Sequence, residues 1–286
     1  MRFRIYLSVK KRNNQGAILM NNSWINISGK VYVVTGGSSG IGKAIVTELL
    51  NNGAVVYNAD LNQGNQQDAN LHFVETNVTD AEAVNQLVTK VVDEQGKIDG
   101  LVNNAGINMP RLLADAEDPH GKYEFTETDF AKMFAVNVKS VFLVSQAVTH
   151  QFEKQRYGVI VNMSSEAGLE GSQGQSVYSA TKGAINGFTR SWAKELGEHN
   201  IRVVGVAPGI MEATGLRTLS YEEALAYTRH KTVDDIRAGY KSTSTTPLGR
   251  SGKLSEVADA VNYLLSERAS YITGVTINVA GGKSRG

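Results

Sequence analysis

Short apolar runs alternate with longer amphipathic segments along most of the chain. The runs have the length and composition of buried strands, and they cover residues 31–34, 54–59, 71–74, 98–102, 159–161, 201–206 and 275–279. Between them, apolar residues recur at helical spacing, most clearly over 82–95, 126–152, 176–197 and 255–265. Strands separated by helix-length segments predict βαβ units and a parallel sheet covered by helices on both faces. We therefore expect a single doubly wound α/β domain of the Rossmann type, with about seven strands.

Polar residues mark the expected starts of two of these helices. Thr79 with Glu82, and Thr126 with Asp129, have the spacing of a capping box, in which two side chains satisfy the first free N–H groups of a helix. Residues 209–250 differ from the rest, because they hold only two short helical patterns before the last long helix. We expect this segment to form a lid over a substrate.

The first apolar run leads into a glycine-rich turn, Thr-Gly-Gly-Ser-Ser-Gly-Ile-Gly at 35–42, and a helical pattern follows it. Such a turn brings free N–H groups and the positive end of a helix dipole to one point, where a phosphate can bind. Gly40 and Gly42 would let a pyrophosphate and a neighbouring strand approach closely. The same residues fit the nucleophile elbow of hydrolases, with Ser38 as nucleophile. A turn without a ligand is the third interpretation.

Asp60 favours the dinucleotide interpretation. It ends the second apolar run and lies 18 residues after Gly42, the spacing of a carboxylate that binds the hydroxyls of an adenosine ribose. A 2′-phosphate would meet a like charge there, and no Arg or Lys follows within several residues. The expected cofactor is therefore NAD rather than NADP.

Composition narrows the class of protein. The chain has 286 residues, 41% of them hydrophobic, and no cysteine. Disulfides and thiolate metal sites are excluded, and a cytoplasmic location is consistent with this composition. No run approaches the roughly 18 apolar residues of a membrane span. The five histidines show no metal-ligand spacing, so we expect no metal.

Charge separates the N-terminus from the remainder. Residues 1–19 carry five basic and no acidic residues, which leaves 24 of the 29 basic residues against 28 acidic ones in the rest of the chain. We interpret 1–19 as a disordered extension and 20–286 as the single domain. The domain has no basic stripe with interleaved aromatics, so nucleic acid is not an expected partner.

Further motifs occur in order along the chain. Asn-Asn-Ala-Gly stands at 103–106, and Ser165 precedes Tyr178-x-x-x-Lys182 by thirteen residues. Together with the glycine turn, Asn137 and Pro208-Gly209, these residues resemble the short-chain dehydrogenase/reductase family over nearly everything after residue 24. Tyr-x-x-x-Lys alone occurs often by chance, whereas the complete ordered set is highly specific.

The resemblance implies a catalytic tetrad of Asn137, Ser165, Tyr178 and Lys182. Oxidation of an alcohol needs a base near neutral pH, and Tyr178 would be that base. Lys182 lies one helical turn further on, so its charge would help to lower the phenol pKa, and the resemblance adds contact with the nicotinamide ribose. Ser165 would hold the substrate oxygen, and Asn137 a water in a proton relay. The family also implies a homotetramer.

The resemblance further implies a cofactor site along the turns that follow the strands. Its expected residues are Gly36, Ser39, Gly40, Ile41, Gly42, Asp60, Asn77, Val78, Asn104, Ala105, Gly106, Tyr178, Lys182, Pro208, Gly209 and Ile210. Three features depart from the family pattern. Asn77 stands where Asp is more usual, Thr214 lies one residue later than the common spacing, and Ala280 replaces the near-terminal Asp.

Longer segments resemble the members of this family that interconvert sorbitol 6-phosphate and fructose 6-phosphate. They are residues 102–113, 164–172, 215–218, 252–259 and 271–283. A phosphorylated substrate needs a local cation. Beside Ser165 and Tyr178, we expect Arg111 to bind it first, with Arg217 and Lys231 as weaker candidates. Another sugar alcohol or ketone, or a protein that senses NAD without turnover, are the alternatives.

Overall fold

The structure is a computed structural model that describes residues 24–242 and 244–284. Within them, parallel strands form one seven-stranded sheet in the order β3-β2-β1-β4-β5-β6-β7. The strands are β1 (Val31–Thr35), β2 (Val55–Asp60), β3 (Leu71–Glu75), β4 (Gly100–Asn103), β5 (Gly158–Met163), β6 (Ile201–Pro208) and β7 (Thr276–Val279). The predicted doubly wound α/β fold is thereby confirmed, and each predicted strand lies within two residues of its predicted bounds.

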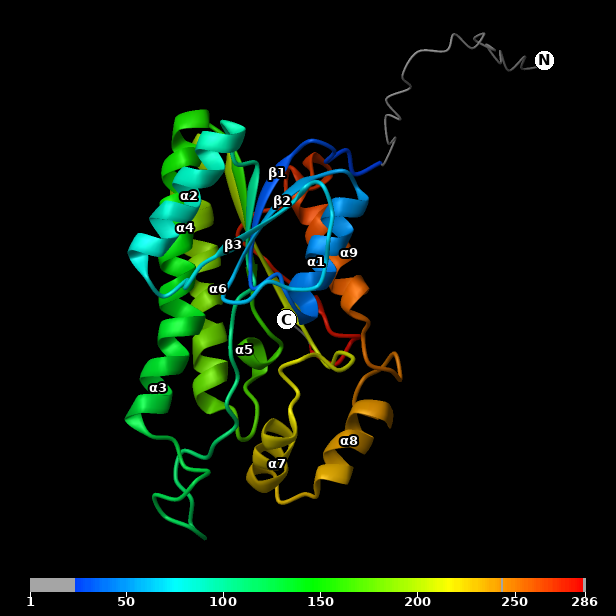
Figure 1. Ribbon diagram of the computed structural model, residues 1–286. Helices are drawn as coiled ribbons and strands as arrows, with labels where there is room; N and C mark the ends of the chain where they lie inside the picture. The colour runs from blue at the N-terminus through cyan, green and yellow to red at the C-terminus, as the bar shows by residue number, and fades with distance from the viewer. Residues whose placement is uncertain (1–23, 243, 285–286) are drawn as a thin grey trace, which may run out of the picture.

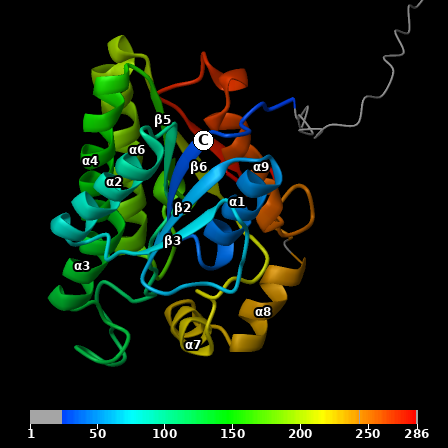
Figure 2. The same ribbon diagram turned by 45° about the horizontal axis from the view of Figure 1, so that its top comes forward.

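Helices cover both faces of this sheet (Figures 1 and 2). The helices α1 (Gly40–Asn51) and α9 (Leu254–Leu265) lie on one face, whereas α2 (Ala81–Gln95), α4 (Ser140–Gln155) and α6 (Ser176–Leu196) lie on the other. Because side chains alternate along a strand, Tyr32 and Val34 pack on the α1 side while Val31 and Val33 pack on the α4 side. This two-sided burial explains why the strands read as continuous apolar runs.

The helix predicted over 126–152 is interrupted. Its first part is α3 (Glu127–Phe134), capped by Thr126 and Asp129 as predicted. A π-helical turn, Ala135–Lys139, then joins α3 to α4. The capping box predicted at Thr79 is wrong. The helix begins one residue later than that box requires, so Asp80 occupies the cap position and accepts the N–H of Glu82 at 2.9 Å.

Shorter helices lie beyond the carboxyl ends of the strands. The one-turn α5 (Ala167–Glu170) follows β5, and α7 (Leu219–Thr228) and α8 (Val233–Ser242) lie toward the lower end of the molecule in Figure 1. These last two pack on each other through Leu225, Ala226 and Ile236. The expected extension at 1–19 lies outside the described residues. Among the described helices, none has the length and apolar character that crossing a membrane requires.

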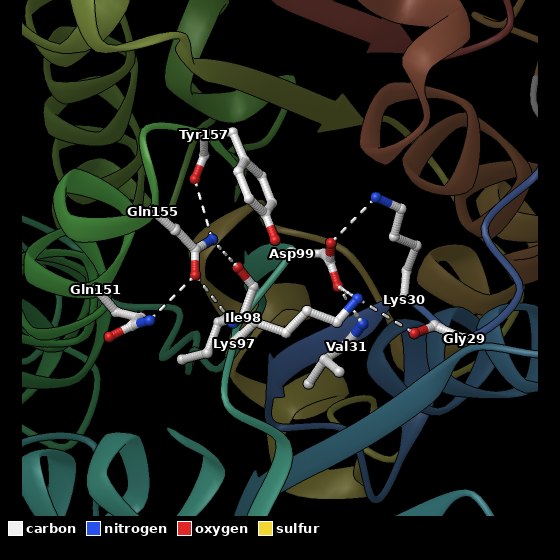
Figure 3. A network of polar contacts seen from close by, with 9 residues as sticks. All are labelled: Gly29, Lys30, Val31, Lys97, Ile98, Asp99, Gln151, Gln155 and Tyr157. Atoms are coloured by element: carbon white, nitrogen blue, oxygen red, sulfur yellow. Dashed lines mark hydrogen bonds and ion pairs between the residues drawn. The ribbon is translucent and has the colours of Figure 1, made fainter. Parts of the chain in front are cut away.

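The amino ends of β1 and β4 are joined by a buried carboxylate (Figure 3). The side chain of Asp99 is 4% exposed, accepts the backbone N–H of Val31 at 2.8 Å, and pairs with Lys30 at 3.1 Å and Lys97 at 2.9 Å. Gln155, at the end of α4, joins the segments before β4 and β5, because its side chain donates hydrogen bonds to the carbonyls of residues 98 and 157. These contacts fix the amino ends of β1 and β4, which lie at the opposite end of the sheet from α7 and α8.

We expect Asp99→Ala to lower the free energy of unfolding by about 2–4 kcal/mol, because it leaves the buried Val31 N–H without an acceptor and two lysines without their partner. Lys97→Ala is the control, and its loss should stay below about 1 kcal/mol since that side chain is partly exposed. Urea denaturation at one protein concentration measures both. Equal losses in the two variants would contradict a special role for Asp99.

Candidate active site

The glycine turn lies against the end of β4 with no space between them. Gly36 and Gly40 have positive φ angles of 67° and 54°, which favour glycine. A Cβ on Gly42 would lie 2.1 Å from the carbonyl oxygen of Gly36 and 2.4 Å from Nδ2 of Asn104. Asn104 itself donates to the carbonyls of Thr35 and Gly36 at 3.1 and 3.0 Å. The turn is therefore held in one shape by the residue that follows β4.

The start of α1 fits a pyrophosphate. Ser39 occupies the N-cap position without making a side-chain cap hydrogen bond, and no acidic residue lies in the first turn. The N–H groups of Gly40, Ile41 and Gly42 therefore keep their capacity to bind an anion at the positive end of the helix dipole. Thr214, from the 209–250 segment, reaches within 3.4 Å of where a Cβ on Gly40 would be. This segment therefore extends over the turn.

Asp60 lies beside the same turn, at the end of β2. Its carboxylate accepts the N–H groups of Ser38 at 3.0 Å and Leu61 at 2.7 Å. The hydroxyl of Ser38 donates to the carbonyl of Asn62 and accepts from Asn58. Ser38 thus has backbone and amide partners, and no histidine contacts it among the described residues. These contacts do not support the nucleophile-elbow interpretation.

The other expected cofactor residues follow the carboxyl ends of the neighbouring strands. Val78 is buried, and Asn77 is exposed with its side-chain oxygen bound to Thr79. Ala105 donates its N–H to the Thr35 hydroxyl at 3.1 Å. A Cβ on Gly106 would lie 3.3 Å from Oδ1 of Asn137 and 3.8 Å from Nζ of Lys182. Because glycine stands there, these two polar groups are not covered by a side chain at 106.

Pro208, Gly209 and Ile210 follow β6 at the same edge. The N–H of Gly209 donates to the carbonyl of Val279 at 3.0 Å, and the carbonyl of Ile210 accepts from Gly252 at 2.9 Å. A Cβ on Gly209 would lie 2.8 Å from Ala280. The turn that would face the nicotinamide end of a cofactor is therefore packed against the end of β7.

Asn137 is fixed by its neighbours on both sides. It lies in the π-helical turn, is 1% exposed, and exchanges two hydrogen bonds of 2.8 Å with the backbone of Ile107. Its amide also donates to the Thr181 hydroxyl at 3.1 Å. Since Thr181 stands between Tyr178 and Lys182 on α6, this contact joins the turn after β4 to the candidate catalytic helix. Interrupted helices of this kind occur often at functional sites.

Ser165, Tyr178 and Lys182 come together where β5 ends and α6 passes. Ser165 accepts the N–H of Ala167 at 3.2 Å, and its hydroxyl is hydrogen-bonded to the Tyr178 phenol. Lys182 is 6% exposed and donates to the carbonyl of Met163, the last residue of β5, at 2.7 Å. Its Nζ lies 5.8 Å from the centroid of the Tyr178 ring. The structure thus brings all four expected catalytic residues into one cluster.

Burial dominates the ionisation of this cluster. It raises the pKa of the Tyr178 phenol, an effect that the Ser165 hydrogen bond partly opposes. It lowers the pKa of the Lys182 ammonium to about 8. Lys182 donates to the Met163 carbonyl, and burial is the largest cause of the raised phenol pKa. A phenol pKa near neutrality therefore requires positive charge in addition to that of Lys182.

The two arginines expected at the substrate differ in their surroundings. The N–H of Arg111 donates to the carbonyl of Gly174 at 2.8 Å, just before α6, and its side-chain Nε is buried without a hydrogen-bond partner. Arg217 lies 3.9 Å from the Tyr240 ring, and Nε is 3.3 Å from the buried carboxylate of Glu222. Arg111 therefore retains hydrogen-bonding capacity, whereas Arg217 shares the Glu222 carboxylate with Arg237. Lys231, the third candidate, is exposed.

Some residues of the site were not predicted from the sequence. Thr35 accepts the N–H groups of Asn104 and Ala105, and Thr181 accepts from Asn137. Glu166 pairs with Lys283 at 2.7 Å. In the sequence, only the positions of these residues beside recognised motifs indicate a role in the site. Their contacts could not be predicted, because each joins residues far apart in the sequence.

Comparison with known proteins defines the class. A family model described as short chain dehydrogenase matches residues 30–224. The chain therefore belongs to the short-chain dehydrogenase family. It is 59% identical over 267 residues to the sorbitol-6-phosphate 2-dehydrogenase of Klebsiella pneumoniae, which covers 93% of this chain and 100% of that protein.

Other relatives share the fold but have different names. The 3-oxoacyl-(acyl-carrier-protein) reductase of Thermotoga maritima is 38% identical over 90% of this chain and 99% of its own length. The crystal structure of a 3-ketoacyl-(acyl-carrier-protein) reductase from Brucella melitensis, complexed with NADH, superimposes with a TM-score of 0.76 at 27% identity, covering 91% of this chain and all of that one. The chain is thus an oxidoreductase that uses a nicotinamide cofactor.

The lowered pKa of Lys182 predicts a pH dependence of stability. Below about pH 8, Lys182 is charged in both the folded and the unfolded protein, and burial of this charge destabilises the folded state. Between about 8 and 10.5, the unfolded chain still binds the proton that the folded protein has released, so stability rises with pH. Relative to Lys182→Met, the free energy of unfolding should increase by up to roughly 3 kcal/mol over this range.

Urea unfolding of both proteins at several pH values measures this difference, and subtraction of the variant removes the titration of other groups. A difference that stays constant from pH 8 to 10.5 would show that Lys182 is not desolvated as its contacts indicate.

Proposed function

We propose that this protein oxidises sorbitol 6-phosphate to fructose 6-phosphate with NAD. The cluster of Ser165, Tyr178 and Lys182 is the observation that carries the proposal, because it supplies a hydrogen-bond donor, a base and a cation at one point. Identity of 59% along the full length of a sorbitol-6-phosphate 2-dehydrogenase supports the choice of substrate.

In this mechanism the Ser165 hydroxyl holds the oxygen of the substrate alcohol, and the Tyr178 phenolate removes its proton. When bound, the oxidised nicotinamide would accept the hydride and contribute a positive charge that lowers the phenol pKa. Lys182 binds the nicotinamide ribose and keeps a cation near Tyr178. Asn137, held by Ile107 and Thr181, positions a water that returns the proton to solvent.

The contacts of Asp60 favour NAD over NADP. Its carboxylate occupies the N–H of Ser38, a donor that could otherwise bind a 2′-phosphate, and it places a negative charge at that position. The first cation that follows in the sequence, Lys90, lies on α2 and pairs with Glu94. Asp60 would instead accept hydrogen bonds from the two ribose hydroxyls of NAD. The glycine turn, Asn77 and Val78 would form the rest of the adenosine side.

Arg111 is our first candidate for the substrate phosphate. It lies beside Gly174, four residues before Tyr178, and it has no ion-pair partner in the part of the chain that the structure describes. Arg217 is the second candidate, since a phosphate there would have to compete with Glu222. We also propose that residues 209–250 act as a lid, which the approach of Thr214 to Gly40 supports. We also propose a homotetramer from the family resemblance, and a cytoplasmic location from the cysteine-free composition.

NADH formation tests the proposal with sorbitol 6-phosphate, mannitol 1-phosphate, sorbitol and xylitol, each with NAD and NADP. We expect sorbitol 6-phosphate with NAD to give the highest kcat/KM. Tyr178→Phe should lower kcat by roughly 100-fold or more, since it removes the base. If another pair is preferred, the substrate proposal fails. If Tyr178→Phe equals the wild type, a protein that binds NAD without using Tyr178 is the better hypothesis.

Arg111→Ala should raise KM for sorbitol 6-phosphate by roughly 10- to 100-fold through loss of charge-assisted hydrogen bonds. KM for unphosphorylated sorbitol should change little. Arg217→Ala is the matched comparison, and it should discriminate less between the two substrates because a phosphate at Arg217 would compete with the Glu222 carboxylate. Steady-state kinetics on both substrates measure the effect. An equal change for both would rule out a phosphate role for Arg111.

A further inference from the structure

We infer that Glu166 selects the substrate by accepting a hydrogen bond from the hydroxyl on C1, next to the carbon that is oxidised. Lys283 positions this carboxylate. The inference rests on the proposed function and assigns a subsite within it. It depends on where Glu166 lies, on which of its oxygens is occupied, and on the separate contacts of Arg111 and Glu166.

Glu166 lies at the junction of three strand ends. It follows Ser165 directly after β5, and its N–H donates to the carbonyl of Pro208, at the end of β6, at 3.0 Å. Its Oε2 would be 2.9 Å from a Cβ on Gly209, a position that also abuts Ala280 after β7. The carboxylate therefore lies between the Ser165 turn and the Gly209 turn. These are the two turns that would border the reacting carbon and the nicotinamide.

Only one oxygen of this carboxylate is occupied. Oε1 lies 2.7 Å from Nζ of Lys283, and the two side chains are 13% and 30% exposed. The backbone of Lys283 is fixed by a hydrogen bond to the Ala280 carbonyl at 3.2 Å, in a turn whose Gly281 carbonyl accepts from Leu248. No described residue donates a hydrogen bond to Oε2. Oε2, on the side of Gly209, is therefore available to accept a hydrogen bond.

The chemistry of this oxygen suits a polyol. An ionised carboxylate only accepts hydrogen bonds, and a substrate hydroxyl is a good donor to it. Lys283 favours the charged form and restricts its rotation. A substrate without a hydroxyl at this place would leave a half-buried carboxylate oxygen unsatisfied, and such sites discriminate strongly against the analogue that lacks the group.

The contacts of Arg111 and Glu166 indicate which hydroxyl is involved. Arg111 binds Gly174 just before α6, whereas Glu166 binds Pro208 at the end of β6 and pairs with Lys283 beyond β7. The candidate phosphate site and the Glu166 site therefore have no contact residue in common. With C2 at Ser165 and the phosphate of C6 toward Arg111, the short end of the molecule points to Glu166. That end carries the C1 hydroxyl.

The test compares fructose 6-phosphate with 1-deoxyfructose 6-phosphate as substrates for reduction by NADH. For the wild type, we expect kcat/KM to fall by roughly 10- to 100-fold when the C1 hydroxyl is absent. For Glu166→Ala, the ratio of the two kcat/KM values should approach one, because the group that detects the hydroxyl is gone. For Lys283→Met, which keeps the carboxylate, a ratio of several-fold should remain.

A purely structural role would lower both rates equally and leave the wild-type ratio unchanged in Glu166→Ala, which would overturn the inference. If Glu166→Ala does not fold, as judged by circular dichroism, Glu166→Gln replaces it and should give an intermediate ratio. Failure of the wild type to reduce fructose 6-phosphate would instead refute the proposed function. The same ratio is then measured on the ketose that the protein does reduce, with and without the hydroxyl next to its carbonyl.

Discussion

The contact between the ends of β1 and β4 determines the rest of the site. Asn104 spans two consecutive carbonyls at the end of β1, and Thr35 binds two N–H groups after β4 in return. The absence of a side chain at Gly42 is what allows this approach. Three residues further along, Ile107 exchanges two hydrogen bonds with Asn137. The cofactor turn and the candidate proton relay are therefore parts of one rigid unit.

The charge at the active site differs in sign from the net charge of the domain. Acidic residues exceed basic ones in the body of the chain, yet Lys182 is buried at the centre of the site. Desolvation lowers the pKa of Lys182 and raises that of Tyr178, so both groups are disfavoured in their charged forms. A bound cation would reverse this balance for the phenol while opposing the ammonium.

The sequence predicted local features well and long-range ones poorly. All seven strands and the Thr126 cap followed from periodicity and spacing. The π-helical turn at Asn137 did not, because its cause is the partner backbone at Ile107 and the hydroxyl of Thr181, both distant in sequence. The Thr79 cap failed for a smaller reason, since a one-residue shift of the helix start gave that role to Asp80. The order of the motifs and a family resemblance brought Ser165 and Tyr178 together, which local pattern alone could not do.

A relative with 38% identity is named a 3-oxoacyl-(acyl-carrier-protein) reductase, whereas the relative with 59% identity is named a sorbitol-6-phosphate 2-dehydrogenase. The groups that set the substrate must then lie outside the hydride-transfer cluster. In this fold they can come only from the turns after the strands, since the strands themselves are covered on both faces. Arg111 and Glu166 stand on the connections after β4 and β5, and their contacts differ, to Gly174 for Arg111 and to Pro208 and Lys283 for Glu166. In the roles proposed for them, the cation binds one end of a short polar molecule and the carboxylate the other, and an apolar acyl chain would satisfy neither.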